Sequence, residues 1–70
     1  MDTVFDRRSE RTRARLLAAF TNLVFAKGFE NVSVRDIVVA ADVARSTFYE
    51  HFSDKEDVLR ASMPILSRLQ

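Results

Sequence analysis

Apolar residues recur with helical spacing through most of this chain. Between residues 9 and 27 they fall three or four positions apart, which is the repeat of one face of an α-helix. The positions on that face are Leu16, Ala19, Phe20, Leu23 and Val24, with Lys27 at its end. Ser9 is the favoured N-cap and Asp6 the alternative, and Gly28 stands where a left-handed residue often ends a helix. The pattern predicts a helix over about residues 9–27.

Two shorter helical segments follow, over about residues 33–41 and 45–51. Ser33 is a good N-cap for the first segment, and Asp42 can adopt the left-handed backbone that a tight turn between the segments needs. The second segment places Phe48 and Phe52 one helical turn apart, so its polar residues lie off that stripe. Two short helices, a tight turn and a polar outer surface on the second helix are typical of a helix-turn-helix DNA reader.

A fourth helix is predicted over about residues 54–63. Ser53 and Glu56 have the spacing of a capping box at its start, and Pro64 should kink or end the helix because it lacks an amide hydrogen. The remaining residues, 64–70, look like the opening turn of a further amphipathic helix in a truncated chain. The predicted fold is therefore all-α, a three-helix bundle with a helix-turn-helix, plus the start of a fourth helix.

Composition supports this fold and limits its chemistry. A single Gly and a single Pro argue against a turn-rich β fold, and the absence of Cys suits a reducing cytoplasm. No apolar run approaches the roughly 20 residues that a membrane span requires. The net charge is only +1, but five Arg fall within residues 7–15. Residues 1–8 are predicted to form a flexible basic arm that either lies along phosphates or is a solvated tail.

Enzymatic and metal-binding chemistry have little support in the residues. The chain has no nucleophile beside a base, no paired carboxylates in an apolar setting and no glycine-rich phosphate loop. His51 is the one histidine, and no Cys accompanies it, so a metal site is not expected. We therefore predict no catalytic residue, no metal and no cofactor.

Two cations stand where a helix N-terminus disfavours positive charge. Arg35 lies in the first turn of the segment 33–41, and Lys55 lies among the acidic residues that open the fourth helix. Each could be a solvent-exposed side chain without function, or, for Lys55, part of a weak surface ion pair. A bound phosphate or DNA base would explain both cations better.

The residues also carry a family resemblance over about two thirds of the chain. The matching positions are Leu16, Leu17, Ala19, Gly28, Phe29, Ser33, Val34, Arg35, Ile37, Ala41, Val43, Thr47, the block Phe48 to Phe52, Lys55, Glu56 and Leu59. In this combination the chain resembles the N-terminal DNA-binding domain of the TetR family of transcriptional repressors. Three positions depart from the family pattern: Asp42 replaces the usual Gly, Ala44 the usual Ser and Val38 a small Ala.

The resemblance implies an arrangement on DNA in which the helix 45–51 enters the major groove. The residues implied to approach bases are Arg35, Arg45, Ser46 and Tyr49. Those implied to hold phosphates are Ser33, Thr47, Tyr49, His51 and Lys55. The resemblance further implies a double-stranded operator as partner, and a C-terminal domain, absent from this chain, that dimerises and binds a small-molecule inducer.

The predicted organisation is thus a basic arm (1–8), a DNA-binding domain (9–63) and the beginning of that C-terminal domain (64–70). The expected function is sequence-specific DNA binding by a ligand-responsive cytoplasmic regulator, in the manner of a repressor. The near-neutral charge keeps a second hypothesis open, in which the same fold serves as a helical protein-interaction domain without binding DNA.

Overall fold

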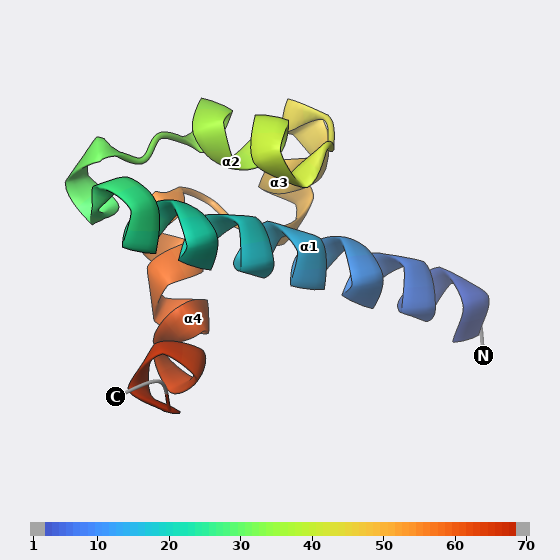
Figure 1. The fold of residues 1–70 in the computed structure, drawn as a ribbon. Coiled ribbons are helices and arrows are strands. Elements are labelled where there is room, and N and C mark those ends of the chain that lie inside the picture. Colours follow the sequence, from blue (N-terminus) through green and yellow to red (C-terminus); the bar gives the residue numbers. More distant parts are fainter. Residues whose placement is uncertain (1–2, 69–70) are drawn as a thin grey trace.

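The computed structural model describes the backbone of residues 3–68 and the side chains of residues 8–63. The elements in chain order are α1 (Thr3–Lys27), the short 3-10 turn η1 (Phe29–Asn31), α2 (Val34–Ala41), α3 (Arg45–His51) and α4 (Lys55–Arg68). Every regular element in this part of the chain is helical, so the all-α prediction is confirmed. The helix α1 is a long rod with α2 and α3 on one side, while α4 crosses it and extends from the other side (Figure 1).

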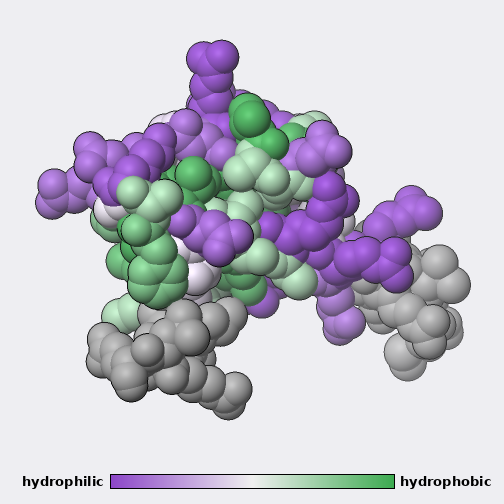
Figure 2. All heavy atoms as spheres, viewed as in Figure 1, coloured by the Kyte–Doolittle hydropathy of each residue, from purple (hydrophilic) through white to green (hydrophobic). Residues whose placement is uncertain are grey.

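The apolar face predicted for residues 9–27 lies at the centre of the core. Leu16 and Phe20 have no exposed surface, and they belong to one buried cluster with Ile37 and Phe48. The buried apolar side chains are Leu16, Leu17, Ala19, Phe20, Val32, Ile37, Val38, Ala41, Phe48, Phe52 and Val58. Figure 2 shows hydrophobic residues gathered between hydrophilic ones on the face in view. Removal of these side chains from water, at about 1.5–3 kcal/mol for each large one, is the main force that holds the helices together.

The helix α1 begins earlier than the sequence pattern predicts. Its backbone is helical from Thr3, so Ser9 lies inside the helix and does not cap it. Residues 3–8 contain no Gly or Pro, and each residue added to an existing helix gains one hydrogen bond without a new nucleation cost. Residues 3–8 of the predicted flexible arm therefore continue α1 in their backbone, and residues 1–2 lie outside the described part of the chain.

Gly28 ends α1, as predicted, but in a different backbone conformation. Its φ of 85° is positive, whereas its ψ of 149° lies outside the left-handed helical region. This combination is essentially restricted to glycine, because a Cβ atom would clash with the backbone. The amide N–H of Gly28 still donates to Val24 at 2.8 Å, and the Asn31 side chain donates to the Lys27 carbonyl at 2.8 Å. These bonds satisfy the Val24 and Lys27 carbonyls at the end of α1.

The start of α2 is capped as the sequence predicts. The Ser33 hydroxyl accepts from the Asp36 N–H at 3.1 Å, and the Asp36 carboxylate accepts from the Ser33 N–H at 3.0 Å. The same carboxylate lies 3.0 Å from the Lys27 ammonium at the end of α1. Hydrogen bonds from Lys27 and from the Ser33 backbone hold the pKa of Asp36 below its ordinary value. The cap thus also ties α2 to α1.

The start of α4 differs from the prediction by one residue. Asp54, not Ser53, is the capping residue, because its carboxylate accepts from the Asp57 N–H at 2.8 Å. Asp57 in turn accepts from the Ser53 N–H at 3.0 Å, which lowers the pKa of the Asp57 carboxyl. The predicted pairing of Ser53 with Glu56 is wrong. A charged carboxylate is a stronger acceptor for orphan N–H groups than a neutral hydroxyl, which favours the shifted cap.

Pro64 was predicted to kink or end α4, and it does not end the helix. The helical backbone continues from Lys55 to Arg68. Within a helix, proline removes a single hydrogen bond and costs roughly 3 kcal/mol, and it does not prevent the following residues from adding turns. The following residues, 65–68, contain neither Gly nor a second Pro that would stop the helix.

Candidate nucleic-acid interface

The turn between α2 and α3 is built around Asp42. Its φ of 59° and ψ of 50° place it in the left-handed helical region, as predicted from its ability to replace glycine there. The N–H of Asp42 donates to Val39 at 3.2 Å, and the N–H of Val43 donates to Val38 at 3.1 Å. These two bonds end α2. Two residues separate Asp42 from the start of α3.

Arg15 holds this turn from α1, a role that the sequence did not reveal. Its guanidinium donates to the Ala41 carbonyl at 2.7 Å and lies 3.9 Å from the Asp42 carboxylate. The carbonyls at a helix C-terminus carry partial negative charge and attract cations. In the sequence, Arg15 was simply one of five Arg in residues 7–15. Only the packing of α1 on α2 brings it to the turn.

The inner side of α3 is fixed by aromatic packing. Phe48 has no exposed surface, and Phe52 is 4% exposed. The Phe48 ring meets the Tyr49 ring edge-to-face at 5.1 Å between centroids and lies 5.7 Å from the Phe52 ring. The Arg13 guanidinium covers the Phe52 ring at 5.5 Å. Because the helix is anchored in this way, the direction of its outer side is determined.

The outer side of α3 carries three of the four residues predicted to contact bases. Arg45 and Ser46 are exposed, and Tyr49 is half exposed despite its contact with Phe48. The fourth, Arg35, is exposed in the first turn of α2. All four are therefore accessible to a partner. Glu50, for which no contact was predicted, is exposed on the same helix.

The residues predicted to hold phosphates differ in their exposure and in the side of the helix on which they lie. Ser33 is exposed, although its hydroxyl oxygen already serves as the α2 cap. Thr47 and His51 are half-buried and lie one turn apart on the flank of α3, where both line a hollow shared with α1. Tyr49 is two residues away from both Thr47 and His51. Because each residue of a helix is rotated by about 100°, Tyr49 lies on the opposite flank.

Lys55 makes contacts that the sequence did not predict. Its ammonium donates to the carbonyls of Phe29 at 2.9 Å and Val32 at 2.8 Å, and it lies 4.4 Å from the centre of the Phe29 ring. Lys55 thus binds the connector between α1 and α2, in addition to standing at the acidic start of α4. An ammonium has three N–H donors, and these carbonyls use two of them. These two carbonyls leave one N–H donor for another acceptor.

The start of α3 offers a test of the missing cap. Ala44 is the N-cap residue, and its side chain makes no capping bond. We expect Ala44→Ser to raise the free energy of unfolding by about 1 kcal/mol, because the hydroxyl can accept an orphan N–H of α3. Urea denaturation followed by circular dichroism measures the change. Ala40→Ser, at an exposed position within α2, is the control and should be slightly destabilising. Equal effects of the two substitutions would contradict the capping argument.

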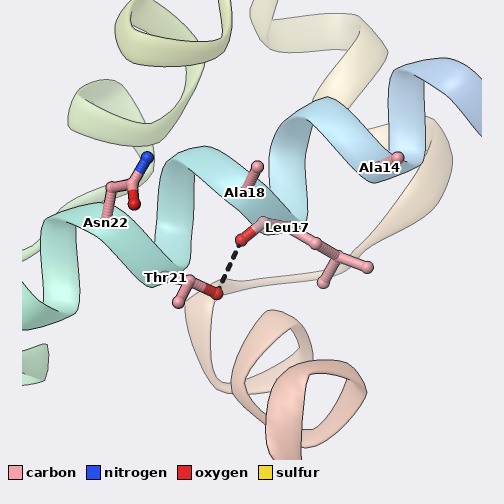
Figure 3. Close-up of a pocket in the computed structure, with 5 residues that line it drawn as sticks. All are labelled: Ala14, Leu17, Ala18, Thr21 and Asn22. Atoms are coloured by element: carbon pink, nitrogen blue, oxygen red, sulfur yellow. Dashed lines mark hydrogen bonds between the residues drawn. The ribbon is translucent and has the colours of Figure 1, made fainter. Parts of the chain in front are cut away.

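A second hollow lies along α1 and has a different character. Its volume is about 350 Å³, and its walls are Ala14, Leu17, Ala18, Thr21 and Asn22. Leu17 and Thr21 point toward the side of α1 on which α4 lies, and the Thr21 hydroxyl donates to the Leu17 carbonyl at 2.9 Å (Figure 3). None of these five side chains is titratable, so this hollow offers no acid–base or metal chemistry.

The rest of the described chain adds no competing site. Among residues with described positions, no group of three or more His, Asp or Glu side chains is arranged to hold a metal ion. Within the same part of the chain, no helix combines the length and apolar character needed to cross a membrane. Two helices joined by a left-handed turn, with an apolar back and a polar front on the second, define the helix-turn-helix class.

Comparison with known proteins identifies the family within this class. A family model described as "Bacterial regulatory proteins, tetR family" matches residues 16–62, and the chain belongs to this family. The TetR family is one of DNA-binding regulators, not of enzymes. The resemblance drawn from the sequence is therefore confirmed.

Several curated proteins are similar to the chain over most of its length. An uncharacterized HTH-type transcriptional regulator of Haemophilus influenzae is 42% identical over 50 residues, which cover 70% of this chain and 24% of the relative. The regulator YxbF of Bacillus subtilis is 36% identical over 79% of this chain and 15% of its own length. TcmR of Streptomyces glaucescens, an HTH-type transcriptional regulator, is 38% identical over 74% of this chain and 23% of its own. The chain spans about a quarter or less of each relative. No solved structure matches it significantly.

Proposed function

We propose that the chain is the DNA-reading head of a ligand-responsive transcriptional repressor, with α3 in the major groove of an operator. The observation that carries the proposal is the division of α3 into two sides. Phe48 and Phe52 are buried, while Arg45 and Ser46 face solvent and the Tyr49 ring is half exposed. A helix held rigidly from behind with hydrogen-bonding side chains in front is what reading of base edges requires.

The proposed contacts follow the exposed positions. Arg35, Arg45, Ser46 and Tyr49 approach bases, and Arg45 can donate two hydrogen bonds to a guanine. The backbone phosphates are held by Ser33, Thr47, Tyr49, His51 and the third N–H of Lys55. These contacts fix the register of α3 in the groove, and the base contacts select the sequence.

The whole regulator is proposed to act as a homodimer in the cytoplasm. Two reading heads would address two half-sites about one helical turn of DNA apart, through a C-terminal domain that also binds a small-molecule inducer. A single head should bind weakly, because the second head supplies a high effective concentration once the first is bound. The relatives, which extend far beyond the length matched here, support a further domain.

The proposal is tested by Arg45→Ala, measured by fluorescence anisotropy with duplexes selected by the chain from a random library. We expect affinity for the selected duplex to fall about 5- to 150-fold, because a bidentate contact to guanine is worth about 1–3 kcal/mol. Affinity for an unrelated duplex should change much less. Arg60→Ala removes the same charge from α4 and is the matched control, since Arg60 is exposed and pairs only weakly with Asp57 at 3.4 Å.

The salt dependence of binding separates this proposal from a protein-interaction domain. Phosphate contacts release counterions, so affinity for DNA should fall steeply and linearly on a logarithmic plot as salt is raised. Failure of the chain to bind any selected duplex at low salt would overturn the proposal. If Arg45→Ala and Arg60→Ala reduced affinity for the selected duplex equally, α3 would not be the helix that contacts the bases.

A further inference from the structure

A polar notch lies between the N-terminal half of α1 and the flank of α3. It has a volume of about 220 Å³, and its walls are Arg8, Ser9, Thr12, Thr47, Glu50 and His51. We call this set of residues the α1–α3 notch. A water molecule takes up about 30 Å³ of liquid, so the notch has room for a phosphate group together with a few waters.

The arrangement of side chains in the α1–α3 notch is regular. Arg8 and Thr12 lie one turn apart on α1, and Thr47 and His51 lie one turn apart on α3. Residues with this spacing project from the same face of a helix. Two helix faces therefore meet across the hollow, and each of these two pairs consists of one hydroxyl and one nitrogen-bearing side chain.

These side chains are suited to an anion. The guanidinium of Arg8 can only donate hydrogen bonds, and the hydroxyls of Thr12 and Thr47 and the imidazole of His51 can each donate one. Within residues 8–63, no hydrogen bond engages the side chains of Thr12, Thr47 or His51, although all three are half-buried. Such groups retain donors that a ligand can use. A phosphate oxygen accepts strongly from both charged and neutral donors.

The position of the α1–α3 notch beside the reading helix indicates which anion it meets. The major groove is about 12 Å wide and an α-helix with its side chains is about 10–12 Å across, so a helix in the groove has phosphates along both flanks. Thr47 and His51 occupy the flank of α3 opposite Tyr49. A strand of DNA passing that flank would lie against the opening between α3 and α1.

We propose that the α1–α3 notch receives one backbone phosphate of the DNA read by α3, with Arg8 and Thr12 of α1 completing a site begun by Thr47 and His51. This inference rests on the proposed function of α3. It adds the start of α1 to the interface, and Arg8, Ser9 and Thr12 all precede the residues 16–62 that match the family model. The site is therefore assigned from this chain's own geometry.

Glu50 limits the affinity of the notch for a phosphate. Its carboxylate is exposed on the wall of the notch and repels a phosphate. It also tempers the attraction of α3 for DNA of any sequence, since phosphate contacts are independent of base sequence. Glu50→Gln should thus raise affinity for all duplexes alike, which is the opposite of the effect of every other substitution in the notch.

The experiment compares Arg8→Gln with Arg11→Gln, using the selected duplex and an unrelated duplex over a series of salt concentrations. Both substitutions remove one positive charge from exposed positions on α1, but Arg11 does not line the notch. We expect Arg8→Gln to weaken binding of both duplexes about tenfold and to reduce the slope of log affinity against log salt by about 0.9. Arg11→Gln should change the slope by much less.

Thr12→Val tests the hydroxyl without changing charge or shape. Loss of one neutral donor should weaken binding about threefold and leave the salt slope unchanged. Circular dichroism of each variant checks that the fold is intact, since Arg8, Arg11 and Glu50 are exposed and Thr12 is only half-buried.

The outcomes separate this inference from the proposed function. If the chain binds DNA and Arg45→Ala weakens it, but Arg8→Gln and Arg11→Gln behave alike, the phosphate site in the α1–α3 notch is overturned and the reading helix stands. If Glu50→Gln weakens binding, the notch does not face a phosphate. If the unsubstituted chain binds no duplex, both proposals are lost.

Discussion

Phe48→Ala should bring the domain to the edge of unfolding. The Phe48 ring has no exposed surface and lies against Tyr49 and Phe52. Truncation of a buried Phe costs about 3–5 kcal/mol, because transfer free energy is lost and a cavity remains. A domain of 70 residues has a total stability of only about 4–10 kcal/mol. Urea denaturation followed by circular dichroism should show the midpoint falling by about a third or more.

Phe25→Ala is the matched control for this substitution. Phe25 is 65% exposed on α1, so removal of its ring forfeits little buried area and leaves no cavity. We expect a change below about 1 kcal/mol. If both substitutions cost the same, Phe48 would not anchor α3, and the assignment of its outer side to DNA would lose its physical basis.

The interior of the fold was predictable because it depends on local periodicity. The spacing of Leu16 and Phe20 fixed the buried face of α1, and the spacing of Phe48 and Phe52 fixed the inner side of α3. The exposure of Ser46 and Tyr49 then followed from helix geometry, since a side chain off the buried stripe must face elsewhere. The left-handed turn at Asp42 was likewise a local property of the chain.

Helix ends were less predictable because competing caps differ by small free energies. Asp54 and Ser53 are adjacent and both can cap α4, and only the bonds of Asp57 decide between them. At Pro64 the cost of one missing hydrogen bond did not outweigh continuation of the helix. Such choices depend on about 1–3 kcal/mol, which residue preferences alone do not resolve.

Contacts between residues that are distant along the chain could not be predicted from the sequence. Arg15 and Lys55 each donate to backbone carbonyls more than twenty residues away, and nothing in their immediate neighbours marks these partners. The α1–α3 notch has the same origin, because Thr12 and Thr47 belong to separate helices that tertiary packing brings together. Sequence therefore predicted the buried and exposed sides of α3, and the structure added the elements that support and flank this helix.

Lys55→Met should destabilise the domain while preserving the apolar stem of the side chain. The carbonyls of Phe29 and Val32 would lose a charged donor, and the Phe29 ring would lose the cation that lies 4.4 Å from its centre. A hydrogen bond to a charged group contributes about 1.5–3 kcal/mol, and exposed cation–π contacts add about 0.5–1 kcal/mol. Because Lys55 is partly exposed and water can reach the carbonyls, we expect a total loss of about 2 kcal/mol in urea denaturation.

Lys27→Met is the control that shows whether the loss of stability in Lys55→Met comes from the contacts with the connector between α1 and α2. Lys27 is also a lysine with an ionic partner, Asp36 at 3.0 Å, but the pair lies at the surface, where such pairs contribute about 0–1 kcal/mol. Equal losses for the two lysines would mean that Lys55 is an ordinary surface cation. If Lys55→Met also reduces the salt slope of DNA binding under conditions where the variant is fully folded, its third N–H donates to a phosphate. An unchanged slope would restrict Lys55 to holding the α1–α2 connector, and the phosphate contacts would then come from α2, α3 and the start of α1.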